Sequence, residues 1–91
     1  MMYQKFEGHE QAAARLVYDE KHNIRGLLSY STIVITVDSE GWMTINGLYS
    51  RTTIKHIGWF MRKIGSSYQT AKQIYIDNYK MNIYTGEVLP L

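Results

Sequence analysis

Residues 27–49 read LLSYSTIVITVDSEGWMTINGLY, and this stretch predicts the centre of the fold. The run 27–37 is rich in β-branched residues and alternates with period two, which is typical of a strand. Residues 38–41 (DSEG) offer a hairpin turn, because the glycine can take a left-handed conformation. Residues 42–49 then return as a second strand. We therefore expect an antiparallel β-hairpin of 27–37 with 42–49.

Two helices are predicted after the hairpin. Apolar residues recur at three- and four-residue steps over 52–64, which indicates an amphipathic helix that begins at a Ser50 or Thr52 cap and ends at Gly65. A second helix is expected over 68–78. Its end stays open between helix and strand at 72–78, because the isoleucines there also fit strand alternation.

The remaining segments complete an α+β prediction. Residues 9–18 (HEQAAARLVY) predict a short helix within an N-terminal extension, 1–25, because successive alanines have the highest helix propensity. Residues 81–89 contain a Thr-Gly turn and predict a short C-terminal strand or hairpin. With 91 residues the chain is expected to form one domain, 1–91, in which the hairpin packs on the helix at 52–64.

Composition excludes several classes of protein. The chain has no cysteine, so disulfides, thiol catalysis and zinc–thiolate sites are excluded. No apolar run is long enough to cross a membrane, and the polar N-terminus lacks the apolar centre of a signal peptide. We therefore expect an intracellular, cytoplasmic protein with no membrane partner. A homo-oligomer is compatible with the sequence.

Charge is distributed unevenly along the chain. The span 41–76 has no Asp or Glu and holds five Lys and Arg residues, so its formal charge is +5, and the other residues sum to −3. A surface of one sign attracts a partner of the other sign and steers its approach. The asymmetry predicts a binding function rather than a chemical one.

The cations of this span concentrate on the helix at 52–64. A 3.6-residue period aligns most of them with an indole, and the predicted partner-binding residues are Arg51, Lys55, Trp59, Arg62, Lys63 and, on the next helix, Lys72. Such a face can dock on an acidic protein, because Arg and Trp are common interface anchors. It can also contact phosphates while the indole stacks on a base. A solvated basic helix face with Trp59 at the edge of the core is the third interpretation.

No pattern in the sequence indicates catalysis or a cofactor. His56 lies beside Thr52 and Thr53, but no second histidine is four residues away and no carboxylate is near in sequence. A hydrogen-bonded structural histidine is the favoured interpretation. There is no nucleophile elbow and no glycine-rich phosphate loop. We expect no enzyme activity, no catalytic residues, no bound metal and no cofactor.

Two motifs connect the hairpin to the helix start: Ser-Tyr-x-Thr at 29–32, and Tyr-Ser-x-Thr-Thr-x-x-His at 49–56. Together they resemble small bacteriophage and prophage proteins of uncharacterised activity. Tyr-x-Thr-Ala-Lys at 68–72 and Thr-Gly-Glu-Val at 85–88 also look like that group, so the resemblance runs from Ser29 to Val88.

The resemblance implies a phage origin and, with it, a type of partner. Compact phage proteins often act by occupying a site on a host protein, including components of host defence complexes. The expected function is therefore non-catalytic binding of a host protein, in its most specific form an anti-CRISPR-like inhibitor. A nucleic-acid-binding accessory protein is the alternative.

Overall fold

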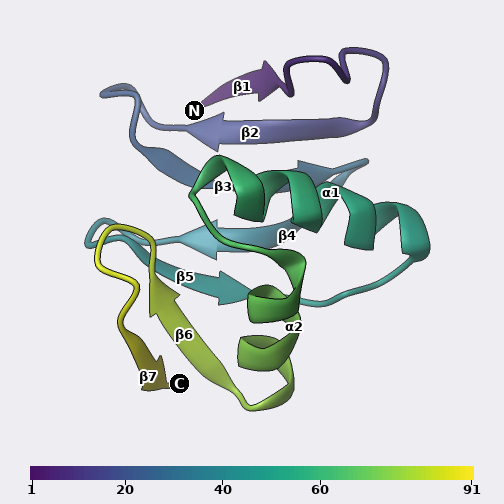
Figure 1. Ribbon diagram of the computed structural model, residues 1–91. Coiled ribbons are helices and arrows are strands. Elements are labelled where there is room, and N and C mark those ends of the chain that lie inside the picture. The colour runs from purple at the N-terminus through teal and green to yellow at the C-terminus, as the bar shows by residue number, and fades with distance from the viewer.

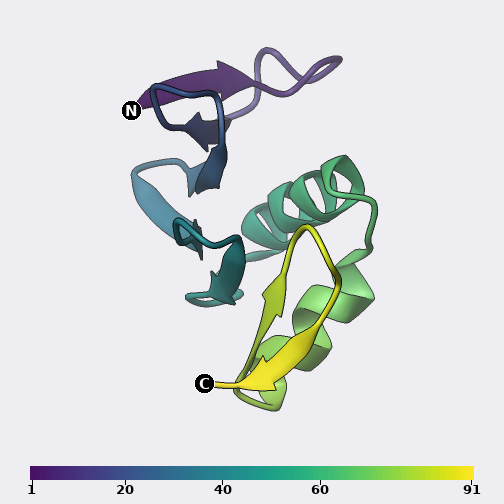
Figure 2. The same ribbon diagram turned by 90° about the vertical axis from the view of Figure 1, so that its left-hand side faces the viewer.

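Seven antiparallel strands form one sheet in the computed structural model of residues 1–91, and two helices cover one face of it (Figure 1). The strand order in the sheet equals the order in the chain. Figure 2 shows the sheet curving around the helices, with its other face bare. The elements are β1 Met2–Lys5, β2 Ala14–Tyr18, β3 Ile24–Ser29, β4 Thr32–Val37, β5 Trp42–Ile45, α1 Arg51–Lys63, α2 Tyr68–Ile76, β6 Tyr79–Asn82 and β7 Val88–Pro90.

The predicted α+β class is confirmed, and the turn at 38–41 joins β4 to β5 as expected. Asp38 Oδ1 accepts hydrogen bonds from the backbone N–H of Glu40 (2.9 Å) and of Trp42 (3.0 Å), which fixes the turn. Gly41 has a φ of 92°, the left-handed conformation that glycine adopts at no steric cost. The second strand is shorter than the predicted 42–49, because the chain leaves the sheet after Ile45.

The prediction of one strand over 27–37 is wrong. A two-residue turn, Tyr30-Ser31, divides this run into β3 and β4, and Ser29 pairs with Thr32 across it. Tight hairpin turns need positive φ, which favours Gly, Asn and Asp, and neither residue of this turn is of that kind. The β-branched sequence 27–37 therefore does not indicate a turn at Tyr30-Ser31.

The prediction of a helix over 9–18 is also wrong, and residues 1–25 are not an extension. Ala14–Tyr18 is the strand β2, which pairs with both β1 and β3. Ala14 and Leu16 are buried in the core, opposite Ser29 and Leu27. Helix propensity is worth less than about 1 kcal/mol per residue, so burial and strand pairing outweigh it here.

Both helices begin and end close to the predicted residues. Ser50 caps α1, whose inner side buries Ile57, Phe60 and Met61 against the sheet. Ser67 caps α2, which ends at Ile76, so the segment 72–78 is helical over most of its length. The chain then returns to the sheet as the β6–β7 hairpin, the expected C-terminal strand. Neither helix has the length and apolar composition that a membrane span requires.

Candidate functional site

Helix α1 presents four exposed cations to solvent. Arg51 and Lys55 lie on its first two turns, and Arg62 and Lys63 on its last. The last-turn pair is favourable for the helix itself, because cations stabilise the negative end of the helix dipole. The first turn contains no acid, so Arg51 faces the positive end without the usual compensation. The dipole thus disfavours Arg51 and does not stabilise Lys55, so neither cation is explained by helix stability.

Lys72, the fifth predicted cation, lies exposed on α2 rather than α1. It follows Tyr68 by one helical turn, on the same side of the helix. Tyr68 is the residue of α2 that lies against Gly58 of α1, where a Cβ would come 3.9 Å from the Tyr68 Cβ. Lys72 therefore stands on the side of α2 that adjoins α1. We call Arg51, Lys55, Arg62, Lys63 and Lys72 the basic surface.

No carboxylate pairs with any residue of the basic surface. The single salt bridge of the protein joins Arg25 to Asp19, with 2.8 Å between Nη2 and Oδ2. The pKa of Asp19 is lowered to about 2, first by the backbone N–H of Asn23 and further by Arg25. The charge asymmetry of the sequence thus persists in the folded protein as unpaired cations.

Trp59 holds the segment that follows β1 against α1. The His9 ring is stacked on the indole, with 3.8 Å between centroids and 13° between planes. Phe6 and His56 contact the same indole at centroid distances of 5.9 and 5.1 Å. Trp59 is half-buried and packs against the main core, so one face of the ring expected to stack on a base is already covered by His9.

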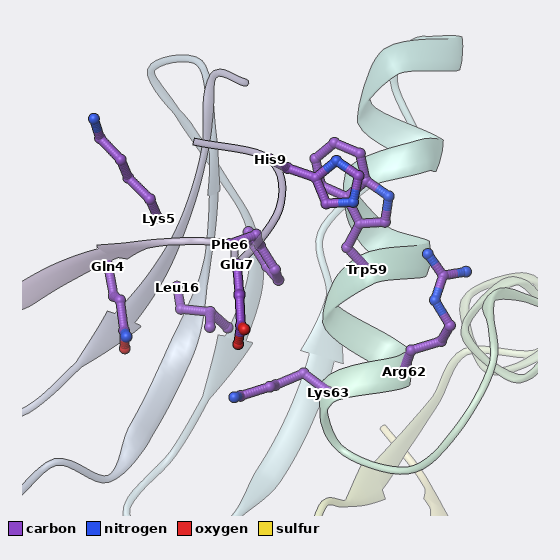
Figure 3. Close-up of a pocket in the computed structure, with 9 residues that line it drawn as sticks. All are labelled: Gln4, Lys5, Phe6, Glu7, His9, Leu16, Trp59, Arg62 and Lys63. Atoms are coloured by element: carbon purple, nitrogen blue, oxygen red, sulfur yellow. The ribbon is translucent and has the colours of Figure 1, made fainter. Parts of the chain in front are cut away.

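A depression of about 330 Å³ lies between this segment and the C-terminal half of α1 (Figure 3). In Figure 3 Lys63 extends from α1 toward the sheet, on the side of Glu7, whereas the Arg62 side chain extends from the other side of the helix. The last two cations of α1 therefore leave the helix in different directions. The lining residues are Gln4, Lys5, Phe6, Glu7, His9, Leu16, Trp59, Arg62 and Lys63.

A buried polar network connects the start of α1 to the end of β3. Ser29 Oγ lies 2.8 Å from Nδ1 of His56 and 3.3 Å from Oγ1 of Thr53. Ser50 Oγ donates to the same Thr53 hydroxyl at 3.3 Å and accepts from the Thr53 N–H at 3.2 Å. The network joins four residues of the two motifs at 29–32 and 49–56.

His56 belongs to this network as a buried, hydrogen-bonded side chain, with 1% of its surface exposed. Burial lowers its pKa from the ordinary value, and nearby Lys55 lowers it further. A serine beside a histidine is also the arrangement of a nucleophile and its base, but Ser29 is only 2% exposed. A substrate therefore has no path to Ser29 Oγ in this conformation. No three His, Asp or Glu side chains are grouped as metal ligands.

Fold and surface together define a small α+β protein with a seven-stranded antiparallel sheet, a helix pair on one face and an unpaired basic surface. The sequence model of a family of unknown function (DUF8033) matches residues 4–78, and the chain belongs to this family. The match runs from β1 to the end of α2. Comparisons with curated proteins and with solved structures gave no match. The family description names no activity and no source, so the resemblance to phage proteins stays a prediction.

Proposed function

We propose that this protein is a non-catalytic binding protein that captures an acidic protein partner through the basic surface. The observation that carries the proposal is the absence of any carboxylate paired with Arg51, Lys55, Arg62, Lys63 or Lys72. A solvent-exposed helix face commonly carries both acidic and basic residues, with opposite charges three or four residues apart. Unpaired charges of one sign raise the rate of encounter with a surface of the opposite sign.

The geometry of Trp59 favours a protein partner over single-stranded nucleic acid. Recognition of single strands depends on aromatic rings on which bases stack. The His9 ring already lies on the indole, and Phe6 and His56 contact it from other sides. The same cations can contact phosphates, so a nucleic-acid accessory protein is the second candidate function.

The resemblance to phage proteins makes a bacterial host protein the partner to test first. Components of host defence complexes are the most specific candidates, and inhibition by occupancy of a site is the mode of action that we infer. Such a role needs no catalytic group, consistent with the burial of Ser29 and His56. It requires a surface complementary in charge to its target.

Capture from a bacterial lysate tests the proposal with two variants of equal net charge. Lys55→Glu/Lys63→Glu changes the basic surface, and Lys21→Glu/Lys80→Glu changes two lysines elsewhere. Each double reversal lowers the net charge by four, from +2 to −2. We expect the first variant to lose the partner and the second to retain it. Equal capture by both variants would contradict the proposal.

The nucleic-acid candidate is tested with labelled single-stranded and duplex DNA. Phosphate contacts predict binding that weakens steeply as salt rises. The result that favours this candidate is a shift of either DNA at low salt that is lost in Lys55→Glu/Lys63→Glu but kept in Lys21→Glu/Lys80→Glu. That result would identify nucleic acid, rather than a protein, as the partner of the basic surface. Absence of a shift at low salt removes this candidate.

A further inference from the structure

Two tyrosines beside the start of α1 hold a backbone conformation that disfavours their side chains. Tyr30 has a φ of 56° and Tyr49 a φ of 52°, both in the left-handed region. Residues with a Cβ are uncommon there, and for a bulky residue the conformation is a true outlier. Glycine or asparagine would occupy either position with less strain.

Both side chains are also largely exposed. The exposed fraction is 60% for Tyr30 and 63% for Tyr49. Most of each ring therefore lies outside the core, and burial does not offset the backbone strain. Strained residues that the surrounding structure holds in place often serve a function, and an observed outlier justifies such a hypothesis. Exposed tyrosine is enriched at protein interfaces because its ring offers a large contact area.

The buried polar network holds these two tyrosines in place. Tyr30 follows Ser29 and Tyr49 precedes Ser50, and both serines contact the hydroxyl of Thr53. The Tyr30 N–H also donates to the Ala13 carbonyl oxygen at 2.7 Å. Each tyrosine is thus the sequence neighbour of a serine that contacts the Thr53 hydroxyl, where the β3–β4 turn lies near the start of α1 (Figure 1).

Each ring is restrained on one side by the protein itself. The Tyr30 ring lies 5.9 Å from the His56 ring, between centroids. The Tyr49 ring lies against Gly47, where a Cβ would come within 2.8 Å of ring carbons. A side chain larger than hydrogen at position 47 would displace the ring. Restraint of this kind lowers the entropy lost when a partner binds.

The charges that the start of α1 places after Tyr49 are both positive, and Glu10, which lines one depression together with Lys55, makes no salt bridge to it. Arg51 and Lys55 follow Tyr49 on the first two turns of α1, and the chain has no acid between Gly41 and Ile76. The β3–β4 turn adds only uncharged residues. A partner that complements this end of α1 therefore carries carboxylates for the cations and apolar side chains for the two rings.

We propose that Tyr30 and Tyr49 are contact residues for an acidic protein segment in which apolar side chains alternate with carboxylates. The inference rests on the proposed function and names the chemistry of its partner. The tyrosines supply apolar contact area, and Arg51 and Lys55 supply the charge. Tyrosine and arginine commonly dominate the energy of such interfaces.

Two fluorescein-labelled peptides measure separately how much charge and how much apolar contact contribute to binding. One alternates glutamate with leucine and the other alternates glutamate with serine. We expect the full chain to bind the glutamate–leucine peptide about tenfold more tightly, as anchoring contacts of this size imply. In Tyr30→Asn/Tyr49→Asn this preference is lost, while the affinity for the glutamate–serine peptide is unchanged. Asparagine tolerates positive φ, so the variant folds with stability equal to or above that of the natural chain.

The matched control is Tyr3→Asn, which removes an exposed tyrosine from β1, away from the start of α1, and keeps the preference. An unchanged preference for leucine in Tyr30→Asn/Tyr49→Asn overturns the inference. The proposed function is tested separately by Lys55→Glu/Lys63→Glu, which is expected to lose both peptides. If that charge reversal binds as tightly as the natural chain, or if the natural chain binds neither peptide, the proposed function fails and this inference fails with it.

Discussion

Replacement of Ser29 by alanine tests the buried polar network most directly. Ser29 Oγ contacts His56 Nδ1 at 2.8 Å and Thr53 Oγ1 at 3.3 Å, and its side chain is almost fully excluded from water. In Ser29→Ala the Thr53 hydroxyl keeps its bond from Ser50, but His56 Nδ1 loses its partner. A buried polar atom left without a partner costs about 1–3 kcal/mol. We therefore expect the free energy of unfolding to fall by about 2 kcal/mol.

Urea unfolding followed by circular dichroism measures this loss. In a chain of 91 residues, about 2 kcal/mol corresponds to a Tm lower by roughly 10 °C. Ser31→Ala is the matched control, because Ser31 is exposed in the turn that follows and makes no side-chain hydrogen bond. Its effect should stay within about 0.5 kcal/mol. If Ser29→Ala changes stability no more than Ser31→Ala, the network does not stabilise the fold as argued.

Two further predictions follow from His56 and from a glycine in the sheet. Because burial lowers the pKa of His56, the folded state binds fewer protons than the unfolded state, so stability is fully present above the unfolded value of about 6.5 and falls as pH falls below it. Urea unfolding at pH values from about 8 to about 5 should show this slope in the natural chain, and the slope should be lost in His56→Gln. Gly26→Ala should unfold the protein or cost at least about 3 kcal/mol, because a Cβ there would collide with the backbone carbonyl oxygen of Ile35. Gly65→Ala has open space around it and should cost only about 1 kcal/mol, for its φ of 83°. Equal Tm values for the two glycine variants would contradict this account.

The parts of the fold that the sequence predicts are those specified by local chemistry. Asp38 and Gly41 supply the side-chain acceptor and the positive φ of a turn, and the β4–β5 hairpin forms there. The three- and four-residue spacing of apolar residues identifies α1, and Ser50 and Ser67 are ordinary helix caps.

The parts that the sequence does not predict depend on tertiary contacts. The β3–β4 turn uses Tyr30 at positive φ, held by bonds from its neighbours rather than by its own preference. The alanine-rich segment becomes β2 because Ala14 fits a fully buried position against β3. Both errors come from local propensity that long-range packing outweighs.

The candidate site divides in the same way. Helical spacing places Arg51, Lys55, Arg62 and Lys63 on α1, and the structure shows all four exposed. The stacking of His9 on Trp59 depends on docking of the segment after β1, which no spacing in the sequence encodes. The contact of Ser29 with His56 joins residues far apart in the chain, although both belong to the two motifs that precede α1.

The strand order bears on how the chain closes its loops. Five of the six strand pairings join neighbours through short connections, so each closes a small loop at low entropic cost. The exception is the pairing of β5 with β6, in which Trp42 pairs with Asn82 across the segment 46–78, which contains both helices. Loop-closure entropy is thus concentrated in one contact of the sheet. The two helices that carry the basic surface therefore form most of the segment that separates β5 from β6 in the chain.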